Sequence, residues 1–161
     1  MNKDLQTFIA NHFSVPGRAL DLGAGDFHDV NALIELGWKA VGVDKTTGVD
    51  LNDLYEDPRM SFNLVYSNFV IHKLLHPEKL VETAYENLDT NGWFFLQTFH
   101  KSDTISSSRL DEETIAGRLD SIGFKNSTIE VLNIYDNDPG HGHWHRVLMA
   151  SAQKVAKECY S

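Results

Sequence analysis

Apolar residues along this chain follow two spacings, one typical of strands and one typical of helices. Strand-like runs are predicted at Arg18–Leu22, Lys39–Val43, Phe62–Ser67, Trp93–Phe99, Ser127–Ile134 and Trp144–Ala152. Helical spacing is predicted at Leu5–Phe13, His28–Leu36, Pro77–Leu88 and Asp111–Ile122. Gly37 and Gly123 act as stop signals for two of these helices, and Asn91-Gly92 is typical of a turn before the fourth strand. Strands and helices therefore alternate along most of the chain.

This alternation predicts an α/β fold, with a mostly parallel sheet of six to seven strands and helices on both faces. Such a doubly wound sheet is Rossmann-like. The last two strands are joined by residues 135–143, which leave no room for a crossover helix, so the final strand is expected to run antiparallel. At 161 residues the chain is expected to be a single domain. We divide it into an N-terminal helix (1–16), a core (17–154) and a tail (155–161).

A glycine-containing loop follows the first strand and opens a helix. Gly23 and Gly25 allow the backbone to turn sharply and to approach a ligand closely. Asp44 ends the second strand, 23 residues after Asp21 (44 minus 21). A carboxylate in that place suits the two ribose hydroxyls of a bound nucleotide. The loop and Asp44 together predict a nucleotide-containing ligand.

The type of nucleotide depends on two residues of the loop. A dinucleotide site would have a third glycine where His28 stands, and it would avoid a carboxylate such as Asp21 beside an anionic pyrophosphate. A carboxylate suits a cationic group instead, such as an ammonium or a sulfonium. The alternative is that Asp21 only caps the turn. A nicotinamide-dependent oxidoreductase is therefore disfavoured.

Five segments carry a resemblance to a known family. The loop resembles the first motif of class I S-adenosylmethionine-dependent methyltransferases, and four later segments resemble further parts of that fold. In order, the matching segments are Ala19–Phe27, Val41–Asp44, Phe62–His72, Gly92–Leu96 and Gly142–Val147. The last of them is similar to the closing strand of small methyltransferases related to the tellurite-resistance group. The resemblance covers about residues 15 to 154 and says little about the substrate.

The resemblance implies S-adenosylmethionine as the cofactor and a role for each matching residue. Asp21 would face the ammonium group of the cofactor. The backbone of Gly23, Ala24 and Gly25 would contact its methionine portion, and Asp44 would hold its ribose.

On the adenine side, the resemblance implies that Lys45 lies near the ring, with Asp50 toward its exocyclic amine and Leu51 against its face. The residues next to the ammonium and the transferable methyl would be Ser67, Asn68 and Phe69. Two departures from the family pattern stand out. Phe27 replaces the usual third glycine, and the interval from Asp44 to Asp50 is too short for a helix and a full edge strand.

Histidines occur where several strands are predicted to end. We expect His72, His100 and His143 to gather around one pocket as candidate catalytic residues, because ligands sit beyond the carboxyl ends of parallel strands. A neutral imidazole there could act as a general base or orient the substrate. A metal site and simple loop packing remain alternatives. The metal alternative would use the alternating His141, His143 and His145 with the nearby Asp136 and Asp138.

We expect no required metal, because the family motif has none. The neighbouring Trp144 is expected in the core beside Leu148.

Composition and charge limit the classes of molecule that the protein is expected to bind. The formal net charge is −9, from 14 basic and 23 acidic residues, and no run of Lys or Arg is present, so nucleic acid is disfavoured. No apolar run approaches the ~20 residues that cross a bilayer, and Met1–Phe13 lacks the apolar block of a signal peptide. Cys159 is the only cysteine. We therefore expect a cytoplasmic protein without a membrane partner.

The expected activity is methyl transfer to a small molecule. The alternative is a non-catalytic module or regulator that binds S-adenosylmethionine. A homodimer partner or the loop at 101–109 could close the pocket, and the same loop could equally be ordinary surface.

Overall fold

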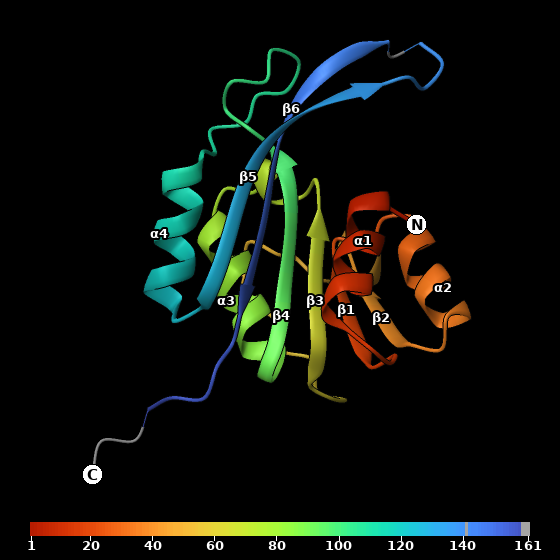
Figure 1. The fold of residues 1–161 in the computed structure, drawn as a ribbon, viewed down its shortest axis with the longest axis vertical. Coiled ribbons are helices and arrows are strands. Elements are labelled where there is room, and N and C mark those ends of the chain that lie inside the picture. The colour runs from red at the N-terminus through yellow and green to blue at the C-terminus, as the bar shows by residue number, and fades with distance from the viewer. Residues whose placement is uncertain (141, 159–161) are drawn as a thin grey trace.

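The structure is a computed structural model that describes residues 1–140 and 142–158, and it contains one six-stranded sheet (Figure 1). The strands are β1 (Arg18–Leu22), β2 (Lys39–Val43), β3 (Phe62–Asn68), β4 (Leu88–Phe99), β5 (Lys125–Asp136) and β6 (His143–Gln153). The helices are α1 (Lys3–His12), α2 (His28–Glu35), α3 (Pro77–Asn87) and α4 (Glu112–Ile122), with short 3₁₀ turns η1 (Lys45–Thr47) and η2 (Ile71–Lys73). No described helix has the length and apolar character needed to span a membrane.

The sheet order is β2-β1-β3-β4-β6-β5. The first four strands in this order pair in parallel, whereas β6 is antiparallel to both of its neighbours, β4 and β5. The predicted α/β fold and the antiparallel final strand are confirmed. No described strand lies beyond β2, because the segment after Asp44 forms η1 and then irregular chain.

The helices cover both faces of the sheet, as Figure 1 shows. Leu5 and Phe8 of α1 pack with Leu33 of α2 in one apolar cluster. Residues of α3 and α4, such as Leu80 and Ile115, belong to a larger cluster on the other face. Each helix thus buries an apolar stripe against the sheet, as its spacing predicts.

The start of α1 is fastened to the centre of the sheet. The Asn2 side chain caps the helix by accepting hydrogen bonds from the backbone N–H groups of Asp4 and Leu5. Its amide nitrogen also donates to the side-chain oxygen of Gln97 at 2.8 Å, and the Gln97 amide donates to Asp4 at 2.8 Å. Because Gln97 is buried near the carboxyl end of β4, these bonds hold the start of α1 over that end of the strand.

Two sequence-based expectations about local structure were wrong. Asn91-Gly92 lies within β4, where the pairing with β3 shifts register and Asn91 takes a positive φ of 71°, so the predicted turn is a bulge. Trp144 is 63% exposed although Leu148 is fully buried. The reason is that β6 continues past the end of β4, and at Trp144 it pairs only with Tyr135 of β5.

Candidate functional site

The direction in which successive strands are added to the sheet reverses at β1, which has β2 on one side and β3 on the other. Such a switch point is where open α/β sheets bind ligands. The loop after β1 turns back on β2, because the N–H groups of Gly23 and Ala24 both donate to the carbonyl of Val43, at 2.9 and 3.0 Å. Gly23 has a φ of 93°, and a Cβ atom there would lie 2.3 Å from Val70. Glycine is therefore required at this position.

Phe27 occupies the place of the usual third glycine. Its φ of 64° lies in the left-handed region, where glycine is favoured, so the backbone here has the shape that the family motif implies. The ring packs over β2: a Cβ atom added at Gly42 would lie 2.7 Å from the Phe27 ring. Phe27 therefore fills the space above Gly42 and keeps the loop in its turned shape.

Asp44 links the end of β2 to the glycine loop. One carboxylate oxygen accepts a hydrogen bond from the Gly25 N–H at 3.1 Å, and the other accepts from the Thr46 N–H at 3.3 Å. The Gly25 hydrogen bond is the main reason that the pKa of Asp44 lies below its ordinary value. Asp44 is thus an ionised hydrogen-bond acceptor at the end of β2, beside the switch point.

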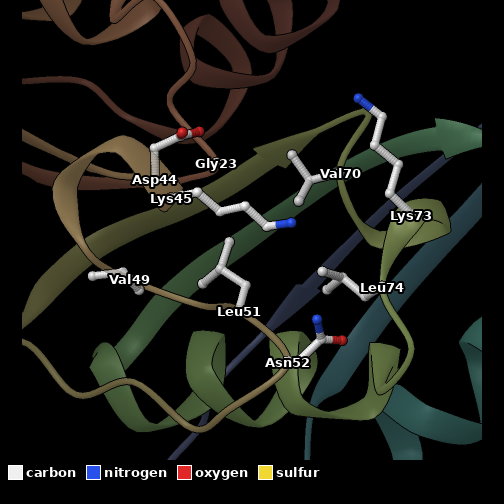
Figure 2. Close-up of a pocket in the computed structure, with 9 residues that line it drawn as sticks. All are labelled: Gly23, Asp44, Lys45, Val49, Leu51, Asn52, Val70, Lys73 and Leu74. Carbon is white, nitrogen blue, oxygen red and sulfur yellow. The ribbon is translucent and has the colours of Figure 1, made fainter.

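A pocket opens beside Asp44 (Figure 2). It is lined by Gly23, Asp44, Lys45, Val49, Leu51, Asn52, Val70, Lys73 and Leu74. Figure 2 shows the Lys45 side chain reaching across it, between Val70 and Leu51. The mixture of apolar walls with a few polar groups is typical of a small-molecule site.

The pocket includes four of the predicted cofactor residues, namely Gly23, Asp44, Lys45 and Leu51. The other seven do not line it, namely Asp21, Ala24, Gly25, Asp50, Ser67, Asn68 and Phe69. Asp50 does not line it, because the Asp50 carboxylate is turned back to accept from the backbone and side chain of Asn52, at 2.9 and 3.1 Å. Sequence reasoning missed five lining residues: Val49, Asn52, Val70, Lys73 and Leu74. Val70 lies within the family-like segment Phe62–His72, and Lys73 and Leu74 directly follow it, so that segment was the available signal.

Asp21 lies beneath the loop and is only 5% exposed. Burial is the main reason that the pKa of Asp21 rises to about 7, and the neighbouring Tyr66 hydroxyl opposes that shift. Asp29, Asp44 and Asp26 raise this pKa further by charge repulsion. Four carboxyl groups around one loop create a negative potential that favours a cationic ligand group.

The end of β3 presents a buried polar side chain. The Ser67 hydroxyl donates to the carbonyl of Leu22 at 2.8 Å and so ties β3 to β1. The Asn68 amide has its oxygen and nitrogen both buried, and neither has a hydrogen-bond partner among the described residues. Phe69 follows with a φ of 60°. Because a buried amide without partners costs free energy, Asn68 suits a polar group of a bound ligand.

The structure places the three candidate histidines in different surroundings. His72 lies beside Phe99, with ring centroids 5.1 Å apart, and the Phe99 ring also contacts His145, with centroids 4.8 Å apart. His143 follows along this row, 4.8 Å from His145. His100 instead hydrogen-bonds to Glu112 at the start of α4. His100 differs because successive residues of a strand point to opposite faces, and Phe99 occupies the other one.

None of the three histidines lines the pocket of Figure 2. His72 is held by a hydrogen bond between its Nδ1 and the Thr98 hydroxyl at 3.0 Å. Burial lowers its pKa, so the ring is neutral at neutral pH.

Residues 101–109 are anchored to β6 by a buried carboxylate. The Asp103 side chain, 1% exposed, accepts hydrogen bonds from the Arg146 N–H at 2.8 Å, the Ser106 N–H at 2.8 Å and the His145 ring at 3.2 Å. Although burial opposes ionisation, these bonds lower the pKa of Asp103 to about 2. The loop is thus fastened next to the histidine row.

Several solved structures that are similar to this chain are described as methyltransferases. TehB from Haemophilus influenzae superposes with a TM-score of 0.74 at 15% identity, over 96% of this chain and 62% of that one. The 1,6-didemethyltoxoflavin-N1-methyltransferase of Burkholderia thailandensis, solved with 1,6-didemethyltoxoflavin and S-adenosylhomocysteine, gives 0.69 at 18% identity, over 96% and 78%. Phosphoethanolamine N-methyltransferase 2 of Haemonchus contortus, with S-adenosyl-L-methionine, gives 0.70 at 16%, over 96% and 53%. Our chain thus spans about half the length of the last protein.

A sequence model of the methyltransferase domain family matches residues 1–147. The chain therefore belongs to the methyltransferase domain family, in agreement with the resemblance seen in its motifs. No curated protein matches the chain in a direct sequence comparison.

Proposed function

We propose that this protein is a methyltransferase that binds S-adenosylmethionine and methylates a small molecule. The observation that carries the proposal is the ionised Asp44 carboxylate at the mouth of a pocket, directly beside the glycine loop. This is where the family motif holds ribose.

The residues present fit the cofactor at three points. Asp44 would accept hydrogen bonds from the ribose hydroxyls. Leu51 and Val70 would pack against the two faces of an adenine ring, with Lys45 moving aside from its place between them. Asp21 and its acidic neighbours would stabilise the ammonium group. When bound, the cofactor supplies an activated methyl group on a sulfonium, so positioning contributes much of the rate.

On the acceptor side, Asn68 and His72 are the proposed working residues. The unpartnered Asn68 amide would orient either the cofactor or the acceptor by hydrogen bonding. In the tautomer whose Nδ1–H donates to the Thr98 hydroxyl, Nε2 is the nitrogen that would accept a proton from an acidic acceptor. The roles of His100 and His143 in turnover are not part of this proposal.

A small acceptor is supported by the similar proteins. Two of those with this fold are named for methylating a toxoflavin precursor and phosphoethanolamine. The acidic charge of this chain, −9 overall, is a second, independent reason to prefer a small molecule over a nucleic acid.

The test is incubation of the purified protein with labelled S-adenosylmethionine and a metabolite extract. We expect S-adenosylhomocysteine to form together with one labelled small product, and calorimetry to show binding of S-adenosylhomocysteine but not of NADH. Binding without turnover on any extract would favour the non-catalytic module. Absence of binding would contradict both functions.

We also expect no retention of tRNA or duplex DNA in a filter-binding assay at physiological salt. The reason is that a protein with a net charge of −9 repels the phosphate backbone of a nucleic acid. Tight binding with a steep dependence on salt would contradict this expectation.

A further inference from the structure

The far end of the β5–β6 hairpin carries a group of metal-ligating side chains on one face. Asp136 of β5 lies directly opposite His143 of β6, and His145 is two residues further along β6. Residues two apart on a strand share a face, and directly opposed residues are neighbours, so the three side chains converge. One ligand atom from each lies within 4.8 Å of the others, and His145 Nε2 is 3.9 Å from an Asp136 oxygen.

A buried carboxylate orients the central histidine. The Nδ1 of His145 lies 3.2 Å from both oxygens of Asp103, and the side chain of Asp103 is 1% exposed. With Nδ1 facing Asp103, the other ring nitrogen, Nε2, is the one that lies near Asp136, at 3.9 Å. This carboxylate–histidine arrangement is the one that commonly supports histidine ligands of metal ions.

We propose that Asp136, His143 and His145 form a binding site for one divalent transition-metal ion, with Asp103 as the supporting carboxylate. Two imidazoles and one carboxylate suit Zn²⁺ or Fe²⁺, whereas Mg²⁺ and Ca²⁺ prefer sites made of oxygen ligands. This inference is independent of the proposed methyl transfer. It departs from the expectation, drawn from the family motif, that no metal is needed.

The geometry requires only a modest closure. Ligands at about 2.0–2.2 Å from a tetrahedral ion are roughly 3.4 Å apart, and the present separations reach 4.8 Å. The hairpin end that carries Asp136 and His143 extends beyond the rest of the sheet (Figure 1), so it is free of the core packing that would resist such a shift.

Three protein ligands leave at least one coordination position for another molecule. His145 packs on Phe99, which packs on Phe69 at the end of β3 with ring centroids 4.9 Å apart. The open position thus belongs to the same end of the sheet as the glycine loop. An oxygen or nitrogen donor of a small ligand is the chemical class that would fill it.

The competing interpretation is an ion-pair cluster, in which His145 bridges Asp103 and Asp136 without any metal. The two interpretations differ in a measurable way. If the cluster is only a set of ion pairs, any Zn²⁺ binding by the chain would not depend on His143 and His145.

The experiment is calorimetric titration of the chelator-treated full chain with ZnCl₂, with MgCl₂ as a second probe. A Cys159→Ser background removes the single thiol. We expect one Zn²⁺ per chain and no comparable binding of Mg²⁺. His143→Ala and His145→Ala should each weaken Zn²⁺ binding at least tenfold, and Asp103→Asn should weaken it about 10- to 100-fold.

The matched control is Asp138→Asn, which removes an exposed carboxylate that is not one of the grouped ligands and keeps the Asp138 N–H that donates to Asp136. Its Zn²⁺ affinity should equal that of the parent. Because His143 is on the projecting hairpin end, His143→Ala should keep the parent's circular dichroism. Absence of Zn²⁺ binding at 100-micromolar-range concentrations, or equal binding by the parent and both histidine variants, would overturn the proposal.

Discussion

Replacement of Asp44 by alanine is expected to weaken binding of S-adenosylhomocysteine at least tenfold. Hydrogen bonds to an ionised carboxylate contribute about 1.5–3 kcal/mol each, and tenfold corresponds to about 1.4 kcal/mol. The variant also removes the acceptor for the Gly25 N–H, so the loop loses a contact that shapes it. Calorimetric titration with S-adenosylhomocysteine measures the change.

The control for this variant is Asp53→Ala. Asp53 is an exposed carboxylate nine residues further along the chain (53 minus 44), and it does not line the pocket. Its affinity should match that of the parent protein, which corrects for the loss of one negative charge. Unchanged affinity in a folded Asp44→Ala protein would remove the ribose assignment and with it the main support for the proposed function.

Binding of S-adenosylhomocysteine is expected to strengthen at least tenfold between pH 5.5 and pH 7.5. Burial raises the pKa of Asp21 to about 7, so the carboxyl group passes from mostly neutral to mostly ionised over this range. Only the ionised form attracts the ammonium group, and each pH unit below the pKa costs up to about 1.4 kcal/mol of that attraction. In Asp21→Asn the affinity should be lower at pH 7.5 and nearly independent of pH.

Asp21 is expected to have the opposite pH effect on the stability of the protein without cofactor. A raised pKa means that the folded state holds the Asp21 proton more tightly than the unfolded state does. The resulting stability is fully present below pH 4 and is lost as the pH rises through about 7. Urea unfolding should therefore show that Asp21→Asn gains stability over the parent at pH 8 more than at pH 5, whereas Asp53→Asn shows no such difference.

The features that could be predicted from the sequence are those that local chemistry determines. The turn at Gly23 needs a positive φ, and Asp44 follows the second strand at a fixed distance, so both could be placed without coordinates. The antiparallel course of β6 followed from the length of the connection alone.

The features that could not be predicted depend on distant parts of the chain. Periodicity assigns Trp144 to a face of β6, but it does not reveal that the neighbouring strand has already ended there. The direction of His100 depends on Glu112, which lies on α4. Asp50 lay outside the pocket because a hydrogen bond to Asn52, two residues away, competes with any ligand.

The double pairing of β6 has a consequence for local unfolding. Residues 147–153 of this strand are paired on both sides, by β4 and β5, whereas 143–145 are paired only with β5. A stretch with one partner opens at a lower free energy than a stretch held between two. We therefore expect residues 143–145 and their partners on β5 to open at a lower free energy than the rest of the sheet, with the glycine loop intact.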